Sequence, residues 1–459
     1  MTSTFDSLAK TLRAAATAGL LLVLAGCGGE RQPPHIFVLS IDTLRADALA
    51  PWGKTPVETP TASALAAEGT VFTRAVTPMG ITIPVHATLL TGLMPRVHGV
   101  RANVHRLADD VPAIVENLDA AGYTSASILS LGAMNFMSGL GRGFDHASDR
   151  EEEGRVFRRD DAETLEMALD WIGQQDGETP VFMLLHLYDV HSPHLRTEYT
   201  PPMPDGYDGP LADGISVETL YNESQQLLAG RPDELAALRA LYAGEAAEAD
   251  RRVGRFIEAL RTQGLLDNSV VIYLADHGQG LGENDYFGHG PTLEQTVLQV
   301  PIIIRDFRSR GGAQRVTETV GLIDIAPTVL ALAGLNAGGL PGRNLLALGE
   351  AEAPTVYLSE VEQRSSQTEF RPEHFDDEAL AAYFENYKYV ESDGERRLYR
   401  VDETWGQEIQ PVELNELHES LRIWLADRMQ DYREGNASSE RAELDDEAIE
   451  QLRSLGYIQ

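Results

Sequence analysis

The chain has 459 residues, of which 37 are Lys or Arg and 71 are Asp or Glu, so its formal net charge is −34 at pH 7. Hydrophobic residues make up 43% and charged residues 24%, proportions that exclude a largely disordered chain and indicate a globular protein. Such a negative chain is not expected to bind nucleic acid, and its single cysteine excludes an internal disulfide framework and a Cys-rich metal site.

The first 34 residues have the pattern of an export signal. Lys10 and Arg13 precede an apolar run over residues 14–26, which is shorter than the roughly 20 residues that span a bilayer. Residues 24–27 (LAGC) resemble the bacterial lipobox, whose cysteine carries a lipid. We therefore expect a signal peptide at 1–26, a tether at 27–34, lipidation of Cys27 and membrane anchoring in the periplasm or at the cell surface. A plain signal peptide with an incidental cysteine is the alternative.

Four apolar runs have the length and composition of strands buried on both faces, at residues 36–41, 181–187, 270–274 and 300–304. Helical patterns accompany them at residues 61–68, 84–93, 111–121, 161–174 and 233–263. The alternation predicts an α/β fold over residues 35–346, in which helices cover both faces of a mainly parallel sheet. Residues 195–228, rich in Pro, Gly and Tyr, are expected to form a loop insertion near the functional edge of the sheet.

The composition changes after about residue 349. Residues 351–459 contain 27 acidic and 11 basic side chains, which we interpret as a solvated acidic surface. Residues 387–390 and 397–401 are expected to pair as a hairpin, and helical patterns follow at 413–433 and 443–455. These features predict a smaller α+β C-terminal subdomain over residues 347–459 rather than a second enzyme.

Polar side chains follow three of the predicted strands. Asp42 ends the first strand, Asp276 and His277 follow the strand at 270–274, and residues 188–194 (YDVHSPH) follow the strand at 181–187. The carboxyl ends of parallel strands meet at one edge of a sheet, where α/β proteins bind their ligands. Two carboxylates and an imidazole at that edge are suitable ligands for one divalent cation.

Residues 81–92 (ITIPVHATLLTG) predict a further functional element. Pro84 suits the first turn of a helix, where its missing N–H costs nothing. Thr82 would then lie at or just before the N-cap, beside free backbone N–H groups and the positive end of the helix dipole, which together form an anion site. A hydroxyl that binds a metal is acidified and can attack phosphorus or sulfur.

Each of these residues also has a purely structural interpretation, since a strand-end Asp commonly serves a turn and a Thr before a helical Pro commonly caps a helix. Their joint occurrence favours a site, because several segments in chain order resemble the sulfatase-like branch of the alkaline phosphatase superfamily. The resembling segments are residues 40–47 (SIDTLRAD), 59–60 with 65–69, 82–92 with 95 and 98–100, 189–194, 276–278 with 281–283 and 287–290, 324–328 (DIAPT) and 452–457 (LRSLGY). The resemblance covers roughly residues 36–346 and the tail, and implies an alkaline-phosphatase-like α/β/α sandwich.

Transferred position by position, the resemblance implies that Asp42, Asp276 and His277 bind a metal and that Thr82 is both the nucleophile and a further ligand. Four other residues match positions that contact the substrate or protonate the leaving group: His191 and His289 as catalytic residues, and Asn103 and His194 as substrate-binding residues. His98 is expected to support the helix, and His86 stands where sulfatases have Arg.

Three departures from the sulfatase pattern bear on the reaction. Sulfatases convert a Cys or Ser at the position of Thr82 to formylglycine, and Thr does not undergo that conversion. Thr43 replaces the second carboxylate of the usual Asp-Asp pair, which removes an oxygen ligand that favours calcium. Residues 124–127 (TSAS) lack the Lys and His that bind sulfate in that stretch. The Thr nucleophile instead resembles the phosphatase, phosphodiesterase and phosphoethanolamine-transferase branches.

We therefore expect a metal-dependent hydrolase that cleaves an anionic ester, namely a phosphate mono- or diester or a phosphonate ester, through a covalent intermediate on Thr82. A His ligand favours one zinc or manganese ion, with magnesium or calcium as alternatives. The Asp-x-x-x-His spacing of some two-zinc relatives is not met at Asp189, because Pro193 occupies the fourth position. The alternative functions are a sulfatase, a non-catalytic surface lipoprotein that binds glycans or anions, and a transferase that moves a phospho-group onto an envelope glycan or lipid.

Overall fold

The computed structural model describes residues 32–53, 55–149, 156–290, 292–348, 355–361, 379–392, 394–401, 410–411, 416–434, 440–441 and 454. The predicted signal peptide, Cys27 and most of the tether lie outside the described residues, as does the predicted helix over 443–455 apart from Ser454. Within the described ranges, no helix is both long enough and apolar enough to cross a membrane.

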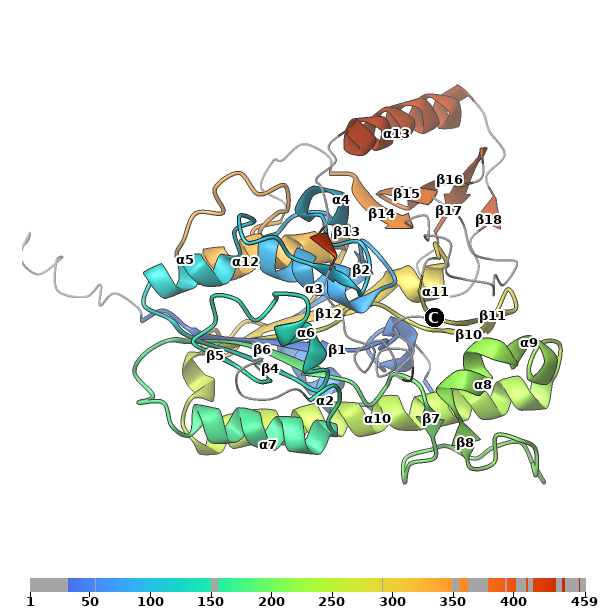
Figure 1. Cartoon of the computed structure of the whole chain (residues 1–459), viewed down its shortest axis with the longest axis horizontal. Helices are drawn as coiled ribbons and strands as arrows, with labels where there is room; N and C mark the ends of the chain where they lie inside the picture. The colour runs from blue at the N-terminus through green and yellow to red at the C-terminus, as the bar shows by residue number, and fades with distance from the viewer. Residues whose placement is uncertain are drawn as a thin grey trace, which may run out of the picture. The chain divides into compact units, whose positions relative to one another are not determined.

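Within the described residues, eight strands form a central sheet in the order β13-β2-β12-β9-β1-β6-β4-β5 (Figure 1). The strands are β1 (His35–Ile41), β2 (Thr70–Val76), β4 (Thr124–Leu129), β5 (His146–Ala147), β6 (Val181–Leu187), β9 (Ser269–Ala275), β12 (Gln299–Asp306) and β13 (Gln314–Gly321). Only β12 runs antiparallel to its neighbours β2 and β9, and the remaining pairs of this sheet are parallel. The prediction of a mainly parallel sheet is confirmed.

The strands that the sequence predicts are the buried strands at the middle of this sheet. Every residue of β1, β6 and β9 is buried, which explains their uninterrupted apolar runs, because a strand covered on both faces has no solvent side. The sequence patterns do not predict β2, β4 or β13. Polar or hydroxyl residues interrupt β2 and β4, and β13 is an edge strand whose first half is largely exposed.

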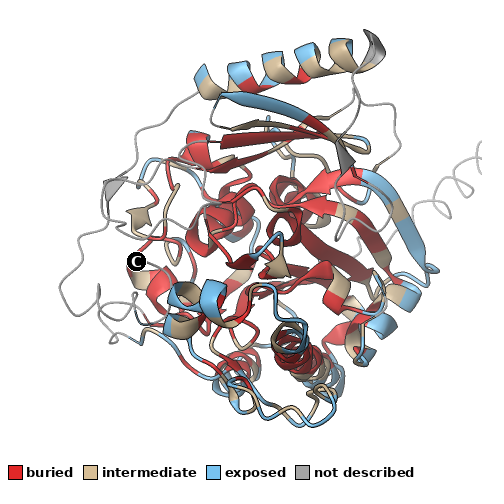
Figure 2. Ribbon diagram, turned by 90° about the vertical axis from the view of Figure 1, so that its right-hand side faces the viewer, coloured by how far each residue is buried: buried red, intermediate tan, exposed pale blue. Residues whose placement is uncertain are grey.

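Two groups of helices cover the two faces of the sheet (Figure 1). On one face, α10 (Pro232–Thr262) contacts α2 (Pro60–Glu68) and α7 (Asp161–Ile172). On the other face, α3 (Thr82–Thr91), α5 (Ile114–Ala120) and α12 (Ile325–Leu332) contact one another. Figure 2 shows the buried residues gathered in the sheet and in the helices packed against it. This arrangement confirms the predicted α/β/α sandwich.

The helix that carries Thr82 starts earlier than the sequence predicts. Its N-cap is Ile81, and Thr82 is its first residue rather than its cap, so α3 begins two residues before Pro84. The helix ends at Thr91, and its C-cap is Gly92, whose φ of 67° lies in the left-handed region that favours glycine. Thr82 is therefore held by helical backbone geometry instead of by a flexible cap.

The insertion at 195–228 is more ordered than the predicted loop. Its first residue pairs within the short hairpin of β7 (His194–Leu195) and β8 (Gly214–Ile215), and two short helices follow, α8 (Val217–Asn222) and α9 (Ser224–Leu227). The prediction of a plain loop is wrong because buried apolar residues of the insertion, Leu211, Leu220 and Leu228, join the main hydrophobic core.

A second, antiparallel sheet follows near the C-terminus. Its order is β14-β15-β16-β17-β18, with β14 (Tyr357–Val361), β15 (Ala379–Phe384), β16 (Tyr387–Ser392), β17 (Glu395–Arg400) and β18 (Gln410–Pro411). The pairing of β16 with β17 confirms the predicted hairpin. Helix α13 (Glu416–Glu434) packs on this sheet through Leu425 and Met429, and its position matches the helix predicted at 413–433. From Pro34 onward the chain forms one compact unit, and the boundary at residue 346 remains a prediction.

Candidate active site

The candidate site begins at the carboxyl ends of two neighbouring parallel strands. In the pairing of β1 with β9, Ile41 lies opposite Ala275, so the residues that follow them, Asp42 and Asp276, emerge at the same level of the sheet. Both side chains are completely buried. The strand register thus brings together two carboxylates that are far apart in the sequence.

The two carboxylate oxygens of Asp276 have different surroundings. Oδ1 accepts the backbone N–H of Thr43 at 3.2 Å and that of His277 at 2.8 Å. Oδ2 is buried and makes no hydrogen bond among the residues that the structure describes. Burial, followed by the negative charge of Asp42, raises the pKa of Asp276 to about 7. A cation beside Oδ2 would stabilise the ionised carboxylate in this environment.

Thr43 fixes Asp276 through its backbone. Its φ is 57°, in the left-handed region that a β-branched residue rarely adopts. In this conformation its hydroxyl donates to the carbonyl oxygen of Asp42 at 2.7 Å, and its own carbonyl accepts the hydroxyl of Tyr242 at 2.7 Å. Thr43 therefore holds the two carboxylate-bearing strand ends, while its hydroxyl is used in a local hydrogen bond.

The ring of His277 faces both carboxylates and Thr82. Its Nδ1 donates to the carbonyl oxygen of Gly278 at 3.1 Å, which leaves Nε2 with a free electron pair. Nε2 lies 3.3 Å from Thr82 Oγ1, 3.5 Å from Asp276 Oδ2 and 3.9 Å from Asp42 Oδ1. Burial lowers the pKa of His277 to about 4, so the ring is neutral at pH 7.

These side chains fit a divalent cation. Ligand atoms held at about 2.0–2.2 Å in a tetrahedron lie roughly 3.3–3.6 Å apart, close to the distances measured from His277 Nε2. Asp42, Asp276 and His277 each offer one ligand atom within 4.8 Å of the others. Two carboxylates with a neutral imidazole suit zinc or manganese better than calcium, which prefers oxygen ligands alone.

The start of α3 is less open to an anion than the sequence suggests. Thr82 is completely buried, and its hydroxyl points to His277. The N–H of the next residue, Ile83, donates to Asn103 Oδ1 at 3.0 Å, and Pro84 has no N–H. The prediction of free N–H groups at this helix end is therefore wrong for Ile83, because the Asn103 side chain already accepts its hydrogen. This hydrogen bond places the Asn103 side chain at the start of α3, one residue from Thr82, and its substrate-binding role stays a prediction.

His191 and His289 form a pair beside the cluster. Their Nε2 atoms are 2.8 Å apart, while His191 Nδ1 lies 2.8 Å from the Ser192 carbonyl oxygen and His289 Nδ1 lies 3.2 Å from the Gly80 carbonyl oxygen. Carbonyl oxygens only accept hydrogen bonds, so each Nδ1 is placed to donate, and a hydrogen bond between the two Nε2 atoms then requires one further proton. Burial, followed by the charge of His289, lowers the pKa of His191 well below its usual value.

The surroundings of His289 connect the pair to the cluster and to the insertion. Its ring stacks on that of His277 with centroids 4.5 Å apart. Its backbone N–H donates to the hydroxyl of Tyr221 on α8, a residue of the insertion at 195–228. The insertion therefore contacts the candidate site, as the sequence predicts, through Tyr221.

His194 has a different set of contacts from the other candidates. Its Nδ1 donates to Glu245 Oε2 on α10 at 2.7 Å, and its Nε2 lies 3.2 Å from the side-chain nitrogen of Gln279. Glu245 also accepts the N–H of Leu195, and burial raises the pKa of Glu245 to about 7. These contacts orient His194 firmly, and no sequence pattern indicated Glu245 of α10 as its partner.

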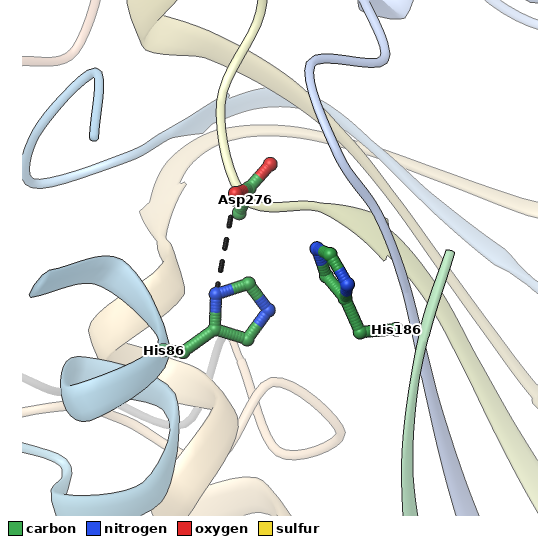
Figure 3. Close-up of side chains that lie close together, drawn as sticks. All are labelled: His86, His186 and Asp276. Carbon is green, nitrogen blue, oxygen red and sulfur yellow. Dashed lines mark ion pairs between the residues drawn. The ribbon is translucent and has the colours of Figure 1, made fainter. Parts of the chain in front are cut away.

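Three other histidines complete the surroundings of the site. His98 Nε2 lies 3.1 Å from Thr88 Oγ1 of α3, and His98 Nδ1 accepts the N–H of Val100. These contacts confirm that His98 supports the helix. His86 and His186 lie close to Asp276, with all three completely buried (Figure 3). In the sequence, His86 was visible only as a departure from Arg, and no motif indicated His186. The available signal was an imidazole within the otherwise apolar run 181–187.

The sulfatase family model matches residues 34–335 of the chain. An arylsulfatase of Clostridium perfringens (strain 13 / Type A) is 24% identical over 366 residues, covering 66% of this chain and 75% of the relative. The uncharacterized sulfatase YidJ of Escherichia coli (strain K12) is 24% identical over 437 residues, covering 86% of this chain and 84% of the relative.

Solved structures resemble the whole fold. The phosphonate monoester hydrolase of Agrobacterium radiobacter aligns with a TM-score of 0.66 and 21% identity, covering 90% of this chain and 99% of the other. BT4656, solved in complex with its substrate D-glucosamine-2-N,6-O-disulfate, aligns with a TM-score of 0.68 and 17% identity, covering 88% and 99%. At these identities the likeness shows a shared fold.

Proposed function

The chain belongs to the sulfatase family, a metal-dependent group of hydrolases that act on sulfate or phosphate esters, and on this premise we propose that it cleaves a phosphorus ester with Thr82 as the nucleophile. One observation carries the proposal. The buried hydroxyl of Thr82 lies 3.3 Å from His277 Nε2, the nitrogen that also faces Asp42 and Asp276. A hydroxyl in this position can be activated as a nucleophile.

The proposed cofactor is one divalent cation, zinc or manganese, held by Asp42, Thr82, Asp276 and His277. When bound, such a cation lowers the pKa of a coordinated hydroxyl and neutralises the negative charge that develops on the ester oxygens. Thr43 and Gly278 contribute backbone hydrogen bonds that orient Asp276 and His277 for this role.

In the proposed reaction, Thr82 Oγ1 loses its proton to solvent and forms a bond to phosphorus as the bond to the leaving oxygen breaks. The His289–His191 pair gives its shared proton to that leaving oxygen, which departs as an alcohol. Water then attacks the phospho-threonine and gives one proton to the histidine pair, while the freed oxygen of Thr82 takes back the proton that it released. Asn103 and His194 are proposed to position the substrate.

Two features favour phosphorus over sulfur as the reacting centre. Thr82 cannot become formylglycine, and residues 124–127 provide no Lys or His for a sulfate group. The likeness to a phosphonate monoester hydrolase agrees with this choice. Hydrolysis of a sulfate ester is the second candidate function, because the relatives from Clostridium perfringens and Escherichia coli are both named as sulfatases.

The proposed location follows from the N-terminal sequence. Lipidation of Cys27 after removal of residues 1–26 would anchor the protein to a membrane, in the periplasm or at the cell surface. Metabolic labelling with a radioactive fatty acid tests this proposal, and a Cys27→Ser protein that kept the label would contradict it.

Metal-reloading assays test the proposed reaction. Purified protein would be stripped of metal, reloaded with zinc, manganese, magnesium or calcium, and assayed on p-nitrophenyl phosphate, a phosphodiester, a phosphonate monoester and p-nitrophenyl sulfate. We expect metal-dependent cleavage of a phosphorus ester that is lost in Thr82→Ala and retained in Thr91→Ala, a control on the same helix whose hydroxyl donates to the Ala87 carbonyl.

Each other outcome has a definite meaning. Cleavage of the sulfate ester alone would select the sulfatase function. A Thr82→Ala protein with near-full activity would refute the nucleophile. Metal binding without turnover of any ester would favour an anion-binding or glycan-binding lipoprotein.

A further inference from the structure

Lys388 of β16 is an unusual residue in this chain. Of the 37 Lys and Arg residues, only three are lysines, at positions 10, 54 and 388. The side chain of Lys388 is nonetheless buried, with 2% of the residue exposed, and lysine is almost never buried to this extent unless it has partners. The contacts of its ammonium group therefore indicate what this lysine does.

The ammonium group contacts the start of α11 (Gln295–Leu298). Lys388 Nζ donates to the Leu293 carbonyl oxygen at 2.5 Å and to Gln295 Oε1 at 3.3 Å. The same Gln295 oxygen accepts the hydroxyl of Tyr383 from β15 at 3.1 Å. Two neighbouring strands of the C-terminal sheet thus hold the first residue of α11 through side-chain donors.

Helix α11 depends on such contacts for its position and in turn holds the loop that carries His277. It has only four residues, and so short a helix is not stable in isolation. The Val297 carbonyl oxygen accepts the N–H of Gly278 at 2.7 Å, and a Cβ on Gly278 would collide with the Thr296 carbonyl oxygen. Because the two backbones touch directly, a displacement of α11 also displaces His277.

Stability alone does not account for a lysine at this position. Burying an ammonium group costs free energy, and replacing a buried charged group by a well-packed apolar side chain is often neutral or stabilising. An apolar side chain of similar length could not hold the Leu293 carbonyl and the Gln295 amide in fixed directions. The ammonium also lies 5.4 Å from the centre of the Tyr383 ring, which favours its position beside β15.

We propose that Lys388 is a positioning residue of the active site, which holds α11 where that helix fixes the loop of His277. Lys388 touches neither the substrate nor the metal, and acts through α11 on the direction of the imidazole. The C-terminal sheet is then part of the catalytic unit and not only an attachment to it. The inference rests on the proposed function only in assigning His277 to the metal.

The zinc affinity of Lys388→Met tests this proposal. Methionine keeps an unbranched apolar stem and removes the N–H donors. We expect the affinity, measured on the full chain by competition with a chromophoric chelator, to fall about 10-fold, the lower end of the range for loss of a residue that orients a metal ligand. The matched control is Tyr389→Phe on the same strand, because this buried hydroxyl donates to Glu391 Oε1 at 2.8 Å and not to α11. That variant should keep the wild-type affinity.

The other outcomes separate a positioning role from a structural one. Equal zinc affinity in the wild type and in folded Lys388→Met would refute the inference, and so would an equal loss in Tyr389→Phe, because a weakened sheet would then explain both. Should circular dichroism show that Lys388→Met does not fold, Tyr383→Phe removes the other donor to Gln295, and an unchanged affinity in that variant would overturn the proposal. Failure of the proposed function is distinct, since a wild type that binds zinc but cleaves no phosphorus ester leaves this comparison of affinities intact.

Discussion

At the scale of single residues, the two carboxylate oxygens of Asp276 have different roles. Oδ1 fastens the side chain to the backbone of Thr43 and His277, and Oδ2 faces the ring of His277. A carboxylate oriented in this way needs no reorganisation when a cation binds. The backbone groups that hold Asp276 therefore matter for cation binding as much as its negative charge does.

Replacing Asp276 with Asn should remove both metal and activity. The amide keeps the size of the side chain but removes the charge, so bound zinc should fall to a small fraction and kcat/KM by roughly 10³-fold or more. Atomic absorption and an ester assay measure the two effects. Asp250→Asn is the matched control, since Asp250 is also buried but accepts N–H groups of Thr61 and Ala62 away from the site. Retention of normal zinc in Asp276→Asn would show that the ligand assignment is wrong.

The histidine pair leads to a prediction about leaving groups. A proton donor matters most when the departing oxygen is strongly basic, so His289→Gln should lower kcat/KM for an alkyl phosphate about 10²–10⁴-fold. For p-nitrophenyl phosphate, whose leaving group departs as a stable anion, the loss should be much smaller. The measurement is kcat/KM against leaving-group pKa for a series of aryl and alkyl esters. Equal losses across the series would exclude proton donation by the pair.

At the scale of elements, close backbone packing fixes the loop that follows β9. The loop leads into β10, which spans Gly280–Glu283. The N–H of Gly278 donates to the Val297 carbonyl of α11 (Gln295–Leu298) at 2.7 Å. A Cβ on Gly278 would collide with the backbone carbonyl oxygen of Thr296. Because this contact involves backbone rather than a flexible side chain, the loop that carries His277 has little freedom to adapt.

Gly278→Ala should therefore weaken metal binding without removing a ligand. The added methyl group must displace either α11 or the ring of His277, and a shift of a few tenths of an ångström is enough to lower zinc affinity, about 10–100-fold by analogy with the loss of a residue that orients a metal ligand. Competition with a chromophoric chelator measures the affinity. Gly312→Ala is the control, because a Cβ there meets no atom within 4 Å. Unchanged affinity in Gly278→Ala would mean that the loop can move.

At the scale of the whole molecule, a buried carboxylate joins the catalytic fold to the C-terminal sheet. Asp324, in the segment DIAPT, accepts the hydroxyl of Tyr357 from β14 at 2.6 Å and the N–H of Arg343 at 2.7 Å. It also accepts the N–H of Gly321 at 3.0 Å. The segment that the sequence marked as familial thus has a structural role in this protein.

The titration of Asp324 should be visible in the stability of the fold. Burial raises its pKa to about 6 from 3.8, so the folded state holds this proton more tightly than the unfolded state. Its contribution to stability is then full below pH 3.8 and is lost as the pH rises through about 6. Between pH 4 and pH 7 the wild type should lose about 1–3 kcal/mol relative to Asp324→Asn in urea unfolding. A difference that does not vary with pH would contradict this assignment.

The net charge of −34 predicts a salt effect on catalysis. A strongly negative molecule repels an anionic ester at long range, and salt screens that repulsion because the Debye length falls from about 30 Å at 0.01 M to about 8 Å at 0.15 M. The kcat/KM for p-nitrophenyl phosphate should therefore rise between these salt concentrations, with kcat nearly constant. A fall in kcat/KM would indicate that local positive charge at the site dominates the approach of the substrate.

The sequence by itself determined the features that depend on local patterns. Continuous apolar runs predicted the central strands, because a strand buried on both faces has no polar side. The same patterns indicated the helices, the hairpin of β16 and β17, and the edge of the sheet to which Asp42, Asp276 and His277 belong. Strands with mixed composition, such as β2 and β13, gave no such signal.

Only the tertiary structure decided which atoms face one another. The strand register sets Asp42 beside Asp276, and it sets Ser40 of β1 opposite His186 of β6. No local pattern reveals that His186 makes no hydrogen bond to the residues that the structure describes, that Asn103 accepts the N–H of Ile83, or that Glu245 orients His194. These contacts join residues far apart in the chain, so their geometry depends on the packing of whole elements and not on the residues that surround each one in the sequence.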